Sequence, residues 1–145
     1  MILPIVAFGS PVLRKKCMEI NSEYSDLKLL LENMWETMYD SSGVGLAAPQ
    51  INKSIRMFII DSSPFIEDEE EEKIVKKVFI NATILKEDGE EWIFNEGCLS
   101  IPEIREDISR KYTIIIKYQD ENFNWQTDTF DGLTARVIQH EYDHI

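Results

Sequence analysis

The stretch QHEYDHI at residues 139–145 contains both histidines of the chain, four positions apart. On a helix, positions i and i+4 lie one above the other on the same face. His140 and His144 can therefore bind one metal ion, and Glu141 beside them can act as a base toward water at that metal. The alternative is a polar helix end with two solvated histidines. We expect a helix over residues 133–145 to carry this motif and to organise the fold.

The composition is that of an ordinary globular protein and predicts a single domain over residues 1–145. Hydrophobic residues make up 43% of the chain and charged residues 29%. No apolar run approaches the ~20 residues that cross a membrane, and no secretory signal is apparent, so we expect a cytoplasmic protein with reduced cysteines. The net charge of -12 argues against nucleic acid or an anionic membrane as partner. The acidic run at residues 67–72 is predicted to be a solvated loop.

The clearest predicted helix covers residues 24–41, where apolar side chains recur at helical spacing. Ser22 or Ser25 is the expected N-cap, and Gly43 the stop signal. The predicted strands are 55–61, 78–85, 90–94, 112–118 and 123–130, of which the last two form a hairpin. Two helices and several mostly antiparallel strands predict an α+β fold. We expect the strands to pack around the C-terminal metal-binding helix, with one further helix near the N-terminus.

A second motif, GVGLAAPQ, occupies residues 43–50. Its two glycines allow a ligand or another chain to approach the backbone closely. Gln50 is a neutral side chain that can donate a hydrogen bond to an oxyanion. A glycine-rich turn between a helix and a strand would look similar. The stretch does not fit a phosphate loop, because no Lys-Ser/Thr pair follows it.

A third motif, EGCLSIPE, occupies residues 96–103. A catalytic site of the zinc type uses three protein ligands and a water, and the histidines supply only two. The third ligand is either the thiolate of Cys98 or one of the 27 acidic side chains. Gly97, next to Cys98, has no side chain that would crowd a metal there. The residues alone leave both choices open, and they also leave the plainer reading of Cys98 as a buried strand cysteine. Cys17 has no motif around it and is expected to be a small buried hydrophobe.

In their order and spacing, the three motifs resemble those of the peptide deformylases, and the likeness runs from the segment PVLR at residues 11–14 to the last residue. The resemblance implies a hydrolase that removes the formyl group from the N-terminal formyl-methionine of new polypeptides and releases formate. It implies one divalent metal held by Cys98, His140 and His144, ferrous iron in the native family with zinc or nickel as substitutes.

The same resemblance assigns roles to further residues. It implies that Glu141 is the general acid/base, and that Gln50 and the backbone N–H of Leu99 are the oxyanion donors. The implied substrate-binding residues are Gly43, Val44, Gly45, Gly97 and Val137. Separately, helix geometry turns Asp143 about 100° away from the metal face, so we expect it not to be a ligand. Its expected partner is Arg110, at the end of the segment that starts with Cys98; the alternative is an aspartate exposed to solvent.

The implied partners are N-formylmethionyl nascent peptides, with no membrane and no direct nucleic-acid readout. Family members usually continue past the histidine motif into a C-terminal helix, which in bacterial members aids ribosome association. The printed sequence stops at Ile145, so we expect weak ribosome contact at most. Two competing readings are a thermolysin-like protease and a non-catalytic module with a structural metal. Metal-dependent formate release without internal cleavage separates all three.

Overall fold

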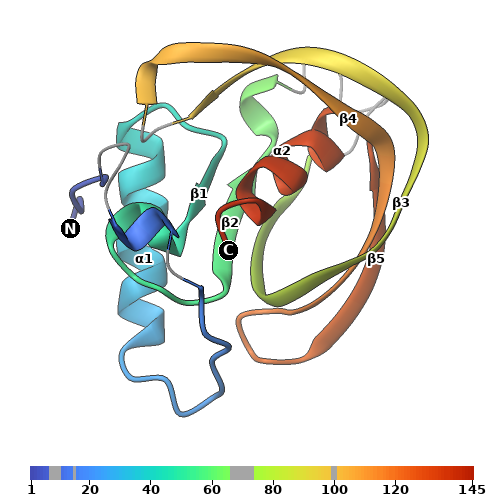
Figure 1. The fold of residues 1–145 in the computed structure, drawn as a ribbon. Coiled ribbons are helices and arrows are strands. Elements are labelled where there is room, and N and C mark those ends of the chain that lie inside the picture. The colour runs from blue at the N-terminus through green and yellow to red at the C-terminus, as the bar shows by residue number, and fades with distance from the viewer. Residues whose placement is uncertain (7–10, 15, 66–73, 99–100) are drawn as a thin grey trace.

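The two helices lie on opposite sides of a strand-rich layer (Figure 1). The structure is a computed structural model that describes residues 1–6, 11–14, 16–65, 74–98 and 101–145, without the side chains of residues 12, 14, 65, 97, 98 and 101–106. The acidic run at 67–72 and Leu99 lie outside the described residues. The helices are α1 (Leu27–Asp40) and α2 (Gly132–Tyr142), with short 3-10 turns at Pro11–Arg14, Ala48–Ile51 and Ser63–Phe65. The strands are β1 (Gly45–Ala47), β2 (Met57–Asp61), β3 (Lys76–Cys98), β4 (Ile101–Gln119) and β5 (Trp125–Asp131).

Helix α1 forms where the apolar spacing predicts it. Leu31, Met34 and Met38 recur every three or four residues and are all buried. Its N-cap differs from the prediction, because Asp26 precedes the helix in a left-handed conformation with a φ of 58° and no side-chain capping bond. The choice of Ser22 or Ser25 is therefore wrong. Beyond the last turn it is Ser42, with a φ of 56°, that takes the left-handed conformation.

The sheet is antiparallel throughout, in the order β1-β2-β3-β4-β5. Strand β2 is buried on both faces, because it lies between the two helices. Its Met57 and Ile59 join the apolar cluster that holds α1, and Phe58 and Ile60 join the cluster that holds α2. Side chains of a strand alternate between its faces, so one short strand serves both clusters.

The predicted strands 78–85 and 90–94 are parts of one strand, β3, so the predicted break between them is wrong. Residues 85–91 are exposed, and the alternation of apolar and polar residues that marks a half-buried strand is lost there. The backbone ladder to β4 carries the strand across this stretch, with register shifts at Ile84/Lys86 and Asp88/Glu91. The predicted hairpin of 112–118 with 123–130 is confirmed as the paired ends of β4 and β5.

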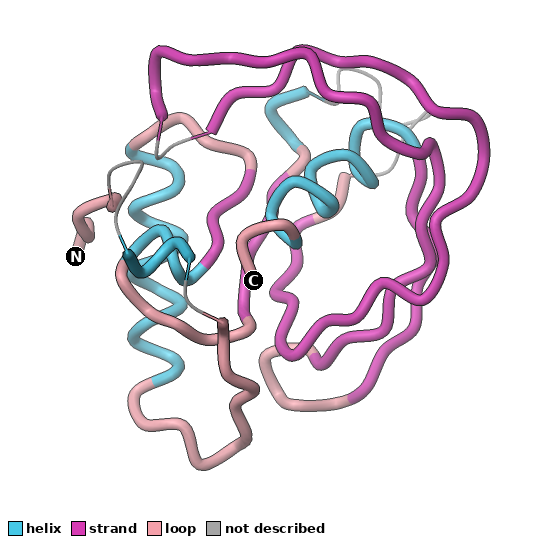
Figure 2. The backbone as a smooth tube through the Cα atoms, viewed as in Figure 1, coloured by secondary structure: helices cyan, strands magenta, loops and turns pink. Residues whose placement is uncertain are grey.

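Strands β3, β4 and β5 curve around α2 (Figure 2). Ala135 and Ile138 of the helix pack against apolar side chains of β2, β3 and β4. The α+β prediction, with strands around a C-terminal helix and one earlier helix, is confirmed. Cys17 is buried as expected, and burial raises the pKa of its thiol. In the part of the chain that the structure describes, neither helix has the length and apolarity that a membrane crossing requires.

Candidate active site

The histidine motif lies at the C-terminal end of α2. The helix ends at Tyr142, three residues before the predicted limit of 145. His144 therefore follows the helix, but its N–H donates to the carbonyl of Glu141 at 3.1 Å, which continues the coil as a tighter turn. The imidazole rings of His140 and His144 lie 5.5 Å apart between centroids, so they share a face as the spacing predicts.

Three side chains of this motif form a group that suits a metal ion. The ligand-capable atoms of His140, Glu141 and His144 all lie within 4.8 Å of one another. Imidazole nitrogens and carboxylate oxygens are ligands of divalent transition metals. Cys98, the expected third ligand, is the last residue of β3, where its backbone pairs with Ile101 of β4, and its side chain lies outside the described residues.

Glu96, near the end of β3, is the centre of a buried charge network. Its carboxylate accepts hydrogen bonds from Nε and Nη2 of Arg110 at 2.8 and 3.0 Å, and another from Arg136. Nδ1 of His140 lies 2.8 Å from its Oε1. Burial disfavours the charged form of Glu96, but the hydrogen bonds from His140, Arg110 and Arg136 outweigh burial and lower its pKa to about 2. Glu96 is therefore ionised, so its oxygens can accept hydrogen bonds but cannot donate them.

The ionised Glu96 fixes the tautomer of a neutral His140. An acceptor beside Nδ1 requires that Nδ1 carries the proton, so the lone pair of a neutral His140 is on Nε2. Metal-binding histidines commonly have their other nitrogen held in this way by a carboxylate, which sets ring orientation and raises ligand basicity. Glu96 is a functional residue that the sequence reasoning missed, although it opens the third motif.

Helix α2 is tied to β3 and β4 by side chains that donate to backbone carbonyls. Arg136 donates to the carbonyl of Trp92 at 2.5 Å and to that of Ile108 at 2.9 Å. Gln139 donates to the carbonyl of Lys111 at 3.1 Å. Hydrogen bonds are directional, so these contacts fix the rotation of the helix about its axis as well as its position. Arg136, like Glu96, was not singled out in the sequence.

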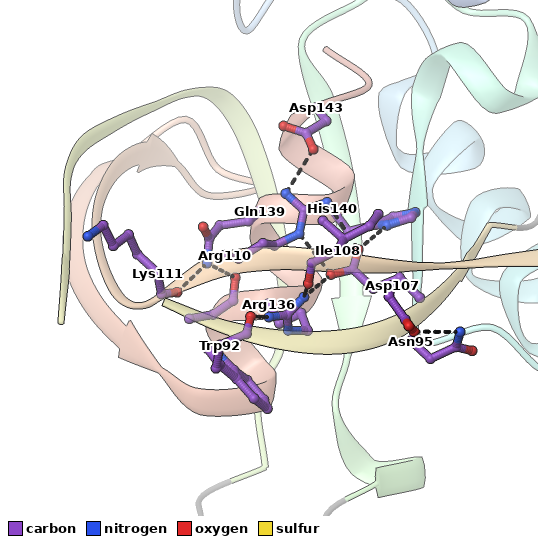
Figure 3. Close-up of polar contacts among 12 residues, drawn as sticks. Trp92, Asn95, Asp107, Ile108, Arg110, Lys111, Arg136, Gln139, His140 and Asp143 are labelled. Atoms are coloured by element: carbon purple, nitrogen blue, oxygen red, sulfur yellow. Dashed lines mark hydrogen bonds and ion pairs between the residues drawn. The ribbon is translucent and has the colours of Figure 1, made fainter. Parts of the chain in front are cut away.

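Asp143 lies just past the helix end and pairs with Arg110, as predicted. Nη1 of Arg110 donates to Oδ2 of Asp143 at 2.9 Å. The guanidinium therefore joins two carboxylates, Glu96 from β3 and Asp143 from the end of α2. Figure 3 shows its contact with Asp143. This contact ties the turn that carries His144 to β4.

Gln50 lies in the turn Ala48–Ile51 and is buried, 1% exposed. Its side-chain Oε1 accepts a hydrogen bond from the backbone N–H of Ala47 at 2.9 Å. Since a backbone N–H needs an acceptor, this contact decides which end of the amide is oxygen and leaves Nε2 as the donor end. The backbone carbonyl of Gln50 in turn accepts from Val6 at 2.7 Å. The amide is thus held as a fixed hydrogen-bond donor.

The remaining predicted site residues fall in two places. Gly43 and Val44 lie between α1 and β1, with the N–H of Gly43 donating to Met38 at 2.9 Å and the carbonyl of Val44 accepting from Asp61 at 2.9 Å. Gly45, the first residue of β1, lies directly against Glu141. The other predicted residues are Val137, half-buried beside the cluster around α2, and Gly97, paired with Arg105 across β3 and β4.

Comparison with known proteins gives one consistent result. The sequence profile of the family described as Polypeptide deformylase matches residues 2–145. The chain is 57% identical to a peptide deformylase of Christiangramia forsetii, in an alignment that covers 100% of this chain and 78% of the relative. Two crystal structures of peptide deformylases are also similar. The Thermotoga maritima protein is 40% identical, with a TM-score of 0.87 over 99% of this chain and 91% of that one. The class I type b protein of Acinetobacter baumannii is 31% identical, with a TM-score of 0.90 over 99% of this chain and 93% of that one.

Proposed function

This chain belongs to the peptide deformylase family, whose members are metal-dependent hydrolases, and from that premise we propose how its own residues divide the chemistry. The reaction removes the formyl group from the N-terminal formyl-methionine of new polypeptides. The observation that carries the assignment of residues is the grouping of His140, Glu141 and His144 within 4.8 Å, with Glu96 against His140.

Cys98, His140 and His144 would hold the metal, for which we propose ferrous iron, with zinc or nickel as substitutes. A thiolate and two imidazoles are ligands that suit these ions. When bound, the metal supplies Lewis acidity, which lowers the pKa of water and polarises a carbonyl. The contact of Glu96 with Nδ1 supports the proposal, because it orients the ring and leaves the lone pair of the neutral imidazole on Nε2.

Glu141 is the proposed general acid/base. Glu141 is only 5% exposed. It lies on the last turn of α2, between the two histidines in the sequence. In this role its carboxylate takes a proton from the attacking water and later delivers it to the leaving amine. The proton thus moves from the water to the carboxylate oxygen and then to the new N-terminus.

Gln50 and the backbone N–H of Leu99 are the proposed donors to the oxyanion that forms at the formyl carbon. Gln50 is suited to this because Ala47 already holds its Oε1, so the Nε2 end is set before the substrate arrives. A fixed donor costs no reorganisation during the reaction, and each such donor is worth about 3 kcal/mol of transition-state stabilisation. Leu99 lies outside the described residues, so its role rests on the family likeness.

The rest of the proposal concerns the substrate and the setting. We propose that residues 1–145 act as one catalytic domain in the cytoplasm, where new chains are made. The peptide chain of the substrate would lie along glycine backbone, and the methionine side chain would enter a small apolar pocket. The proposed residues for these contacts are Gly43, Val44, Gly45, Gly97 and Val137.

The test is formate release from a formyl-methionyl tripeptide by protein loaded with one defined metal. Glu141→Ala should keep its metal and lose turnover by about 10²–10⁴-fold, as expected for the loss of a general base. Cys98→Ala should lose most of its metal. Stoichiometric metal in an active Cys98→Ala protein, or near-normal turnover of Glu141→Ala, would remove that residue from its role.

Two controls make the result specific. Glu141→Gln has nearly the shape of the native side chain but cannot take a proton, so its turnover should fall as far as that of Glu141→Ala. An unformylated peptide of the same sequence should yield no formate and no shorter fragments. Internal cleavage of that peptide would favour a protease instead.

A further inference from the structure

Gly45 occupies a position where no other residue fits beside the catalytic glutamate. A Cβ built on Gly45 would lie 2.7 Å from Oε2 of Glu141, 2.8 Å from its Cγ and 3.0 Å from its Cδ. Non-bonded carbon atoms pack at about 3.5–4.0 Å, so these distances are strongly repulsive. The side chain of Glu141 therefore fills the space that a Cβ at position 45 would need.

Backbone conformation does not explain this glycine. Among the described glycines only Gly89 and Gly132 have a positive φ. Gly45 is in extended strand conformation, which alanine adopts without strain, and it pairs with Ile60 of β2. What position 45 requires is the absence of a side chain.

The two backbones that meet here have little room to separate. On one side, Leu46 and Ala47 follow Gly45 in β1 and are both 0% exposed. On the other side, Arg136 and Gln139 tie α2 to β3 and β4. Because both elements are fixed, an added Cβ is expected to move the carboxylate of Glu141 rather than the strand or the helix.

We propose that Gly45 is a positioning residue for the reaction, because its missing side chain leaves room for the carboxylate of Glu141 in its working position. The proposal rests on the assigned role of Glu141 as general base. It differs from the substrate contact that the family likeness implies for Gly45. A lost substrate contact raises KM, whereas a displaced base lowers kcat. A misplacement of about 1 Å in a catalytic arrangement can cost on the order of 100-fold in rate.

A double-mutant cycle tests the proposal on the metal-loaded protein. Gly45→Ala, Glu141→Ala and the double variant are compared with the native protein in metal content, melting temperature and kinetics with a formyl-methionyl tripeptide. Gly45→Ala should keep its metal, show a kcat about 10–100-fold lower with KM little changed, and melt at a lower temperature. In the Glu141→Ala background the same substitution should leave the melting temperature unchanged, since Cγ, Cδ and Oε2 are gone.

Gly89→Ala is the matched control. This glycine lies in the exposed middle of β3 with a φ of 83°, so alanine is strained there for a reason unrelated to Glu141. Its effect on the melting temperature should be the same with and without the Glu141 side chain. The cycle thereby separates a specific contact from the general cost of replacing a glycine.

Several outcomes would overturn the proposal. These are an equal drop in melting temperature from Gly45→Ala in both backgrounds, a loss confined to KM, or native kinetics. If Gly45→Ala folds only when Glu141 is also shortened, the proposal is supported, and failure to fold in both backgrounds counts against it. If Glu141→Ala keeps near-normal turnover, the base assignment fails, but the melting temperatures still report on the contact.

Discussion

The two helices of this protein differ in how far polar contacts hold them to the sheet. Helix α1 rests on the sheet through Leu31, Met34 and Met38, which are buried among other apolar side chains. Helix α2 also contributes apolar side chains, but among its buried residues are Arg136, Gln139 and Glu141, and its contacts with β3 and β4 include ion pairs and hydrogen bonds. Apolar burial is non-directional, whereas hydrogen bonds fix angles. Directional contacts thus fix the rotation of the helix that carries the proposed catalytic side chains, whereas α1 adds the bond from Tyr39 to Asp61 to its apolar contacts with the sheet.

Among the changes that test this difference between the helices, removal of the Glu96 carboxylate should have the largest effect on stability and metal affinity. Glu96→Ala leaves Arg110 and Arg136 without their shared carboxylate, with side chains only 11% and 3% exposed. Loss of one partner from a buried ion pair costs about 3–5 kcal/mol of unfolding free energy. His140 also loses the group that orients it, so metal should bind about 10–100-fold more weakly. Denaturant unfolding of the metal-free protein and metal competition with a chelator measure the two effects.

Glu96→Gln is the control for that experiment, because it keeps the volume of the side chain and removes only its charge. Its amide oxygen can still accept from one neighbour, so both losses should be smaller than in Glu96→Ala. Unchanged metal affinity in Glu96→Ala would show that His140 is oriented for the metal without the contact from Glu96.

The corresponding test on α1 should affect stability alone. Met34→Ala removes a side chain that is 0% exposed and should lower the unfolding free energy by about 2–5 kcal/mol. Helix α1 carries none of the proposed catalytic or metal-binding residues, so kcat and metal affinity of the folded protein should not change. Leu29→Ala on the same helix, at a residue 56% exposed, should change stability by less than about 0.5 kcal/mol. A fall in kcat for Met34→Ala would contradict this separation.

A smaller effect is expected at the polar contact near the end of α1. The hydroxyl of Tyr39 donates to Oδ2 of Asp61 at 2.6 Å, and burial together with this bond raises the pKa of Tyr39 to about 12. A raised folded pKa means that the contact stabilises the fold fully below the unfolded pKa of about 10 and is lost as pH rises through about 12. Tyr39→Phe should therefore be less stable than the native protein by about 1 kcal/mol at pH 8. The difference should shrink between pH 10 and 12 in denaturant unfolding, and a constant difference would argue against the titration of Tyr39.

The smallest effect is expected at the exposed edge of the network. Asp143 is 62% exposed at its side chain, against 6% for Glu96, although both pair with Arg110. Exposed ion pairs contribute about 0.2–1 kcal/mol and are screened by salt. Asp143→Asn should therefore cost that much at low salt and almost nothing in 1 M NaCl, as measured by thermal unfolding. A cost close to that of Glu96→Ala would mean that burial does not set the strength of these pairs.

The same contrast explains what the sequence could predict. Helix α1 was found from its apolar spacing, because burial leaves a periodic pattern in the chain. The network around Glu96 leaves no such pattern, since it joins residues 14 and 40 positions apart. The sequence therefore indicates neither the role of Glu96 within its motif nor that of Arg136. The sequence predicts the pairing of Arg110 with Asp143, because helix geometry turns Asp143 away from the metal and Arg110 ends the segment that starts with Cys98.

The errors in the strands and helix ends have a related cause. Residues 85–91 of β3 are exposed, so no alternation marks them as a strand, and only their pairing with β4 makes them one. The N-terminal limit of α1 was missed because Asp26, in a left-handed conformation, replaces the serine cap that its sequence suggested. The ends of helices and the exposed parts of strands are set by backbone conformation and hydrogen bonding, which the pattern of side chains does not indicate.

The contact between Gly45 in β1 and Glu141 in α2 joins the first and last thirds of the sequence, and this has a consequence for folding kinetics. The antiparallel pairs of β3 with β4 and β4 with β5 connect consecutive segments and close short loops. Bringing α2 against β1 closes a far longer loop, and its entropy cost must be met before the contact is gained. Glu141, the proposed acid/base, therefore reaches its place only when this long loop between β1 and α2 has closed. In a refolding experiment, the return of turnover should follow the formation of the sheet and report the completion of the fold.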